Sequence, residues 1–137
     1  MIPRSERFRL ALAILVVIPL GLAVKFCVPG VVGRWCNLYG AAILYEICCA
    51  LALRFVFPSL PPTACGATVF IGTCALELLQ LWHPPWLDAV RRTFLGAATL
   101  GQSFDPWDFV YYAIGSALAV PVLMILTRKH GAGERAC

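Results

Sequence analysis

The fold is decided by the stretch Thr63-Ala-Cys-Gly-Ala-Thr-Val-Phe-Ile-Gly-Thr-Cys-Ala-Leu-Glu77-Leu-Leu-Gln80-Leu81, which is long and apolar enough to cross a bilayer. This stretch nevertheless carries a carboxylate, Glu77, with Gln80 one helical turn later. A charged side chain at the centre of a membrane costs about 3 kcal/mol on insertion scales. Membrane proteins that keep such a group pair it, hydrate it or use it, so Glu77 is the first candidate for function.

The composition of the whole chain agrees with a membrane location. Of the 137 residues, 61% are hydrophobic and 13% are charged, and the mean hydropathy is +0.82. A soluble domain has about 45–50% apolar and about 25% charged residues. We therefore predict an all-α integral membrane protein with one membrane domain over residues 1–137. The net charge of +4 comes from bases scattered at predicted helix ends, which excludes a nucleic-acid-binding surface.

Hydropathy predicts four transmembrane helices, over about 8–29, 38–57, 63–81 and 108–127. The segment 83–107 is too apolar for a free loop, and it is too short and interrupted for a fifth span with two turns. It predicts an outer interfacial or re-entrant helix, and whether 86–104 is interfacial or spanning stays open. The first span resembles a signal peptide, but no small-residue cleavage site follows it, so we expect a retained helix.

The placement of Lys and Arg predicts the orientation of the chain. If the N-terminus and the C-terminus lie in the cytoplasm, more Lys and Arg residues fall on the inner side of the membrane than on the outer side. The tryptophans then fall in or beside the two outer loops, where aromatic rings lie among lipid headgroups. The inner bases are Arg4, Arg7, Arg9, Arg54, Arg128, Lys129 and Arg135, the outer ones are Lys25, Arg34, Arg91 and Arg92, and the tryptophans are Trp35, Trp82, Trp86 and Trp107.

The cysteines and histidines do not form a metal-binding pattern. Seven cysteines are present without a Cys-x-x-Cys spacing, and most are expected to pack as small apolar residues. Cys27 and Cys36 share one loop and could form a disulfide if that loop faces an oxidising compartment. His83 has no second histidine nearby, so we predict neither a metal site nor a cofactor.

Polar side chains of the predicted helices gather in the outer half of the membrane. Thr73, Glu77 and Gln80 share one stripe of the third span, which should face protein or water rather than lipid. Glu46 of the second span lies deeper and could pair with Lys25. Glu77 has a structural alternative, which is a buried pair with Arg91 or a protonated acid bonded to Gln80.

The outer segment adds further charged residues. Asp88 and Arg92 have the spacing of a helical ion pair. Asp105, Pro106 and Asp108 have the pattern of a helix start, with Asp105 at the N-cap and Asp108 at the third helical position. Both acids therefore have a structural explanation, although Arg91 could also contact Asp108.

Templates for known enzyme chemistry are missing from the sequence. It contains no Gly-x-Ser-x-Gly, no His-Glu-x-x-His, no phosphate-binding loop and no Cys/His dyad within reach. Catalysis would have to rely on Glu77 as a general base and on a neighbouring arginine as an anion clamp.

A set of spaced residues in the second half carries a family resemblance. The chain resembles the domain of unknown function 2809 family of small, uncharacterised bacterial membrane proteins, and more loosely the VanZ-like proteins of the cell envelope, which are associated with glycopeptide-antibiotic tolerance. The resemblance implies a bacterial inner membrane and an outward-facing polar site, and it implies no reaction. It rests on Glu77-Leu-Leu-Gln80-Leu81, Pro85-Trp86-Leu87-Asp88-Ala-Val-Arg91, Leu95-Gly96, Gly101, Phe104, Asp108, Tyr112 and Gly115.

One departure from the family pattern concerns the second span. The family usually has Gly-Asp followed by Leu-Trp there, whereas Gly40 is followed by Ala41 in this chain. Glu46, just over one helical turn further on, could replace the missing aspartate.

These observations lead to one function hypothesis and two alternatives. The leading hypothesis is a binding or interaction module for an envelope lipid, a lipid-linked glycan or a partner membrane protein. The alternatives are a small membrane hydrolase or transferase with Glu77 as base, and a purely structural membrane subunit. The predicted site consists of Glu77, Gln80, Arg91 and Asp108, with Asp88 and Tyr112 at its edge.

Overall fold

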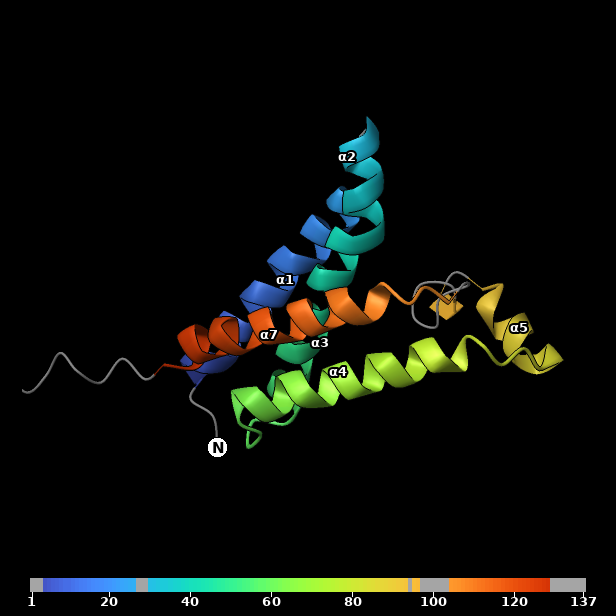
Figure 1. Ribbon diagram of the computed structural model, residues 1–137. Coiled ribbons are helices and arrows are strands. Elements are labelled where there is room, and N and C mark those ends of the chain that lie inside the picture. Colours follow the sequence, from blue (N-terminus) through green and yellow to red (C-terminus); the bar gives the residue numbers. More distant parts are fainter. Residues whose placement is uncertain (1–3, 27–29, 94, 97–103, 129–137) are drawn as a thin grey trace, which may run out of the picture.

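The protein is all-helical in the computed structural model, which describes residues 4–26, 30–93, 95–96 and 104–128 (Figure 1). No strand occurs among these residues. The elements are α1 (Arg4–Phe26), α2 (Gly30–Trp35), the π-helical turn η1 (Cys36–Gly40), α3 (Ala41–Val56), α4 (Pro62–Leu79), α5 (Pro85–Arg91) and α7 (Asp108–Thr127).

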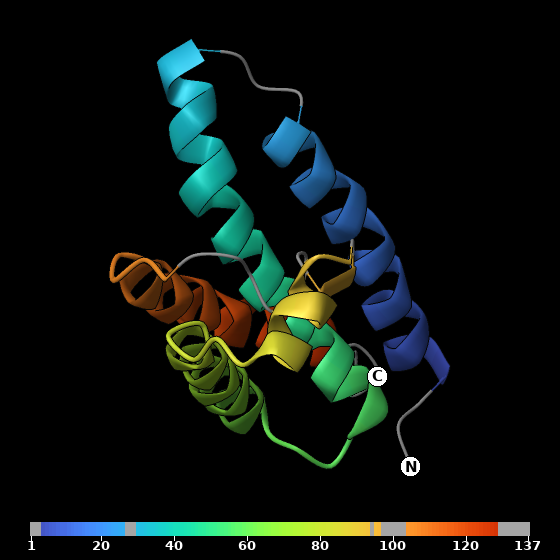
Figure 2. The ribbon, with the colours of Figure 1, turned by 90° about the vertical axis from the view of Figure 1, so that its right-hand side faces the viewer.

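Prolines set several of the helix boundaries. Pro61 is extended and Pro62 occupies the first turn of α4, where the missing N–H of proline costs nothing. Pro84 and Pro85 do the same for α5. By contrast, α2, η1 and α3 follow one another without interruption, because Trp35, Gly40 and Ala41 all have right-handed helical dihedrals. Figure 2 shows them as one rod from Gly30 to Val56.

The helix α3 is at the centre of the bundle and contacts α1, α4 and α7. The helices α4 and α7 lie side by side and antiparallel (Figure 1). Apolar side chains of all four helices meet in one core, which therefore holds together segments that are far apart in the sequence. This core consists of Leu10, Ala50, Leu51, Cys65, Ala119 and Leu123.

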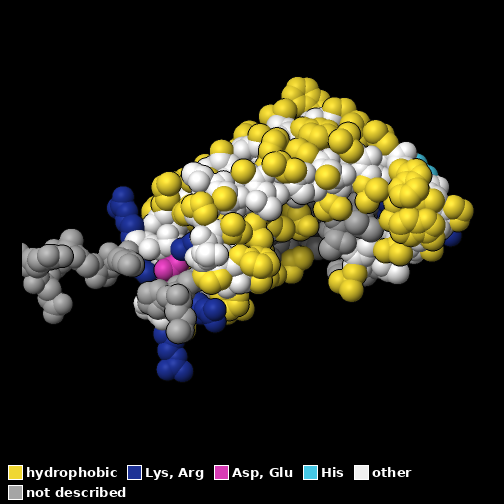
Figure 3. Space-filling view, turned by 90° about the horizontal axis from the view of Figure 1, so that it is seen from below, with side chains coloured by type: hydrophobic (Ala, Val, Ile, Leu, Met, Phe, Trp, Pro, Cys, Tyr) yellow, Lys and Arg dark blue, Asp and Glu magenta, His cyan; other side chains and the backbone are white. Residues whose placement is uncertain are grey.

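The outer surface of the bundle is largely apolar, as the face in Figure 3 shows. Large hydrophobic side chains such as Leu15 and Ile125 are 70% and 65% exposed. Three helices, Arg4–Val24 within α1, Pro62–Leu79 and Asp108–Thr127, are long and apolar enough to cross a membrane. The all-α class is thus confirmed, and these three helices correspond to three of the four predicted spans, with boundaries within a few residues of those expected. The rod that contains α3 covers the range of the remaining predicted span.

Basic side chains gather at the end of the bundle where α1 begins and α7 ends, which we call the Glu6 end. Arg54 of α3 donates to the Glu6 carboxylate at 3.0 Å and to the carbonyl of Leu60. Arg9 donates to the carbonyl of Arg128 at 3.3 Å. The described ends of α1 and α7 therefore lie together, as predicted, with the turn between α3 and α4. On the face seen in Figure 3, most of the visible Lys and Arg side chains lie at this end.

Candidate functional site

Glu77 lies in the last turn of α4, at the opposite end of the bundle, which we call the Glu77 end. Its side chain is buried, with 1% of the residue exposed. The carboxylate accepts three hydrogen bonds: from Gln80 Nε2 at 2.8 Å, from the backbone N–H of Asp105 at 2.8 Å and from the Tyr112 hydroxyl at 3.2 Å. Glu77 therefore joins the end of α4 to the beginning of α7.

Gln80 and Tyr112 reach Glu77 for simple helical reasons. Gln80 follows Glu77 by three residues, and Tyr112 stands one turn after the start of α7. In this arrangement the amide nitrogen of Gln80 faces the carboxylate of Glu77 and donates to it. This leaves the Gln80 Oε1 atom buried without a hydrogen-bond donor among the described residues. The expected grouping of Glu77, Gln80 and Tyr112 is thus present.

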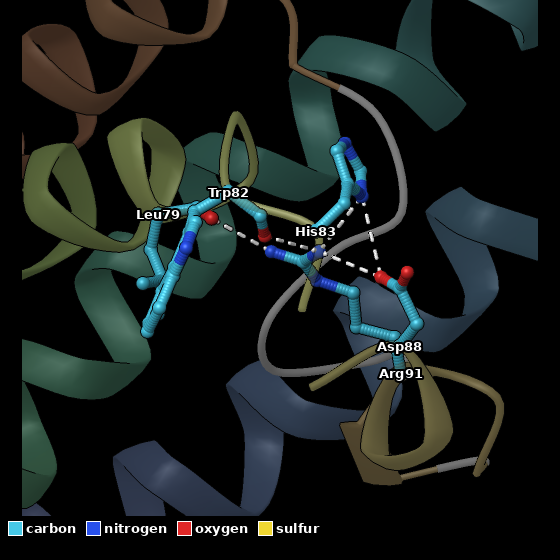
Figure 4. A network of polar contacts seen from close by, with 5 residues as sticks. All are labelled: Leu79, Trp82, His83, Asp88 and Arg91. Atoms are coloured by element: carbon cyan, nitrogen blue, oxygen red, sulfur yellow. Dashed lines mark hydrogen bonds and ion pairs between the residues drawn. The ribbon is translucent and has the colours of Figure 1, made fainter. Parts of the chain in front are cut away.

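The expected pair of Glu77 and Arg91 is absent, because the Arg91 guanidinium binds elsewhere. It donates to the carbonyl of Leu79 at 2.8 Å and to that of Trp82 at 3.0 Å, and it pairs with Asp88 at 3.2 Å (Figure 4). The last carbonyls of a helix lack intrahelical partners and attract cations. Arg91, which is 5% exposed, therefore acts as a cap for α4.

Asp88 contacts Arg91 and His83 rather than the predicted partner Arg92. Its Oδ1 lies 3.2 Å from Arg91 Nη1 and 3.2 Å from His83 Nδ1 (Figure 4). The hydrogen bond with His83 is the main cause that lowers the pKa of Asp88 below its usual value, and the bond with Arg91 adds to it against partial desolvation. Asp88 and Arg91 thus form a separate network that closes the turn between α4 and α5.

Asp105 and Asp108 stand beside Glu77 at the start of α7. The Asp105 carboxylate accepts the backbone N–H of Trp107 at 3.0 Å and so closes a turn just before α7. The predicted N-cap role of Asp105 is wrong, because α7 begins at Asp108 with Trp107 at its N-cap and without a side-chain cap. Asp108 is half-buried and close enough to Glu77 and Asp105 for electrostatic repulsion. No described residue donates a hydrogen bond to its side chain, and no ion pair with Arg91 is formed. We call Glu77, Asp105 and Asp108 the carboxylate cluster.

Three aromatic rings next to the carboxylate cluster were not predicted as part of the site. The rings of Tyr39 and Tyr111 stack with centroids 4.2 Å apart, and Trp35 contacts both, at 6.1 Å and 5.9 Å. Tyr39 also interacts electrostatically with Asp105 and Asp108. Trp35 and Tyr39 are four residues apart, a helical spacing that could have indicated one shared face. We call Trp35, Tyr39 and Tyr111 the aromatic cluster.

A second acid, Glu46 of α3, is fully buried deeper in the bundle. The Ser116 hydroxyl of α7 donates to its Oε2, and Oε1 has no partner among the described residues. Gly115 lets α7 approach, since a Cβ there would lie 2.7 Å from the Cβ of Glu46. The side chain of Lys25, the predicted partner of Glu46, lies outside the described residues.

The described residues contain no group of three His, Cys, Asp or Glu side chains placed to hold a metal ion. In the part of the chain that the structure describes, five cysteines have free thiols, Cys36 among them. The predicted alternative of a bridge from Cys36 to Cys27 involves a residue outside the described ones.

Comparison with known proteins gives a family and no structural relative. No solved structure matches the chain. One family model matches residues 31–116, which is more than half of the sequence and runs from α2 into α7. The matched range includes Glu46, Glu77, Gln80, Arg91 and Asp108, and thus reaches further towards the N-terminus than the resemblance in the second half. The chain belongs to the family described as Protein of unknown function (DUF2809).

Proposed function

We propose that this chain is a four-span protein of the bacterial inner membrane that binds a lipid headgroup at its outer, Glu77 end. The observation that carries the proposal is the position of the carboxylate and aromatic clusters. They lie next to each other at one end of a bundle whose sides are largely apolar. Lipid headgroups lie at the ends of membrane helices, so a membrane lipid is the ligand with the most direct access to them.

The fourth span would be the rod from Gly30 to Val56. Its length is about 40 Å at 1.5 Å per residue, which exceeds the hydrocarbon thickness of about 30 Å. The π-helical turn η1 divides it into pieces, so α3 alone has 16 residues. Insertions of this kind occur often at functional sites. The turn includes Tyr39, which it places against Tyr111 of α7.

The orientation with both termini in the cytoplasm follows from the Glu6 end, where Arg7, Arg9, Arg54 and Arg128 gather. A cysteine-free variant with single reporter cysteines tests it. A cysteine at Thr93, beside α5, should react with a membrane-impermeant maleimide from outside intact cells. A cysteine at Ser59, in the turn after α3, should react only after the cells are opened. The reverse pattern would refute the orientation.

Binding is favoured over base catalysis because Glu77 is already occupied. Three donors contact its two oxygens and the residue is 1% exposed, so a substrate would have to displace a donor and open the packing to deliver a proton to it. A conduction path is not favoured either. Below Glu46 and Ser116 the interior continues as the apolar core of Leu51, Ala119 and Leu123.

The binding proposal is tested by extracting the protein in a mild detergent and weighing it intact in a mass spectrometer. We expect a retained lipid that is depleted in Trp35→Leu and Tyr111→Leu. The matched control is Trp86→Leu, because Trp86 is also exposed but contacts Trp82 at 5.7 Å rather than the aromatic cluster. If the three variants and the wild type all carry the same lipid, or none, the outer-end site is refuted.

A further inference from the structure

We infer that the carboxylate and aromatic clusters recognise the ammonium group of a phospholipid headgroup, an inference that rests on the lipid binding proposed above. A primary ammonium, as in an ethanolamine headgroup, offers a positive charge and three N–H donors. The described residues supply the complementary features: negative charge, an unpaired acceptor and ring faces.

The acids of the carboxylate cluster have no cationic partner among the described residues. Glu77 and Asp105 both repel the Asp108 carboxylate, and none of the three forms an ion pair with another described residue. The buried guanidinium of Arg91, at the same end of the described structure, is bound to the carbonyls of Leu79 and Trp82. An anionic headgroup would add to the repulsion, whereas a cation would relieve it.

The second observation is the unpaired amide oxygen of Gln80. Only 7% of this residue is exposed, and its Nε2 donates to Glu77 at 2.8 Å. The Oε1 atom has no donor among the described residues. A buried acceptor without a donor costs about 1–3 kcal/mol, so this position calls for an N–H or O–H group. The Asp108 carboxylate also lacks a donor among the described residues, and it adds two more accepting oxygens.

The aromatic cluster supplies the third feature. Cations bind over the faces of Trp and Tyr rings, and cages of such rings are a known way to hold ammonium groups. Trp35 is 49% exposed and its ring lies at 80° to that of Tyr111, so part of this side chain is open to a ligand. The neighbouring Arg34 is exposed, and it provides a cation for the phosphate of the same headgroup.

The test uses the full chain in lipid nanodiscs of a neutral carrier lipid, with phosphatidylethanolamine, phosphatidylcholine or phosphatidylglycerol added in trace amounts. Retained lipid is counted by native mass spectrometry. We expect phosphatidylethanolamine to be retained most, because the choline headgroup has a cation without N–H donors and phosphatidylglycerol has no cation. Asp108→Asn should weaken its retention about tenfold, the value of one charge-assisted hydrogen bond. The charge-matched control Glu134→Gln, in the C-terminal tail, should leave retention unchanged.

The outcomes separate this inference from the underlying proposal. If phosphatidylglycerol is retained best and Trp35→Leu still depletes it, the outer site stands and ammonium recognition is overturned. If no lipid is enriched above the carrier, both are overturned. Equal loss in Asp108→Asn and Glu134→Gln would also overturn the inference, because the effect would then be one of overall charge. If Asp108 could be cross-linked to a lysine of another protein and no lipid were retained, the ligand would be a basic protein and not a lipid. That result would also overturn the inference.

Discussion

At the scale of single residues, Glu77 connects α4 to α7 through hydrogen bonds, and substitutions can test how much they stabilise the fold. Glu77→Ala leaves the Gln80 amide, the Asp105 N–H and the Tyr112 hydroxyl without an acceptor. Each unpaired group costs about 1–3 kcal/mol, so we expect a loss of about 3 kcal/mol or more in the free energy of unfolding, measured by SDS titration in mixed micelles.

Glu77→Gln should be much milder, by about 1 kcal/mol. Its oxygen can still accept from Asp105, while its amide can donate to the Tyr112 oxygen and, after rotation of the Gln80 amide, to Gln80 Oε1. Equal losses in the two variants would show that the charge, and not the hydrogen bonding, holds α4 to α7.

The network of Asp88, His83 and Arg91 gives a pH dependence of definite sign. The pKa of Asp88 is lowered on folding, mainly by His83, so its stabilisation is complete above the ordinary value of about 3.9 and is lost as the pH falls through the folded pKa. The fluorescence of Trp82 and Trp86, whose rings are 5.7 Å apart, should therefore change below about pH 4. Asp88→Asn should flatten this change, and an unaltered profile in that variant would assign it to another acid.

At the scale of helices, the contact between α3 and α7 depends on Gly115. A Cβ at this position would meet the Cβ of Glu46 at 2.7 Å and the carbonyl of Ile43 at 3.0 Å, so Gly115→Ala must push the helices apart. We expect a loss of about 1–3 kcal/mol in the free energy of unfolding.

Gly72→Ala is the matched control for Gly115→Ala, because no atom of the described packing lies within 4 Å of a Cβ there. Alanine is about 1 kcal/mol more favourable than glycine in the interior of a helix. The Gly72→Ala variant should therefore be as stable as the wild type or slightly more stable. If both variants were destabilised alike, the close approach of α7 to Glu46 would not be the cause of the loss in Gly115→Ala.

The sequence predicted the helices better than their contacts. The bounds of α4 and α7 follow from long apolar runs with proline at one start and aspartates at the other, which are local signals. The alternative pairing of Arg91 with Glu77 was wrong, because the sequence displays the carboxylate of Glu77 but not the positions of the Leu79 and Trp82 carbonyls that accept from the guanidinium. The aromatic cluster was missed because its rings come from two helices that only the fold brings together.

At the scale of the whole molecule, two polar ends are separated by an apolar core. At one end, Arg54 donates hydrogen bonds to Glu6 and to the carbonyl of Leu60. At the other end, the Tyr112 hydroxyl donates to Glu77. The core residues Leu51 and Leu123 lie between the two ends. Arg54→Gln should cost about 3 kcal/mol because it leaves a buried acid unpaired, and Tyr112→Phe should cost about 1 kcal/mol.

Mutations at distant sites without shared partners usually change the free energy of unfolding additively, within about 0.5 kcal/mol. The loss in the double variant Arg54→Gln/Tyr112→Phe should therefore equal the sum of the losses in the two single variants. SDS titration of the four proteins measures this directly. Additivity would mean that the two ends are not energetically coupled through the core. Retention of phosphatidylethanolamine should then be the same in Arg54→Gln as in the wild type. A double-variant loss well outside that margin would mean that α3 and α7 move as one body, and that the Glu6 end helps to set the geometry in which the carboxylate cluster meets its ligand.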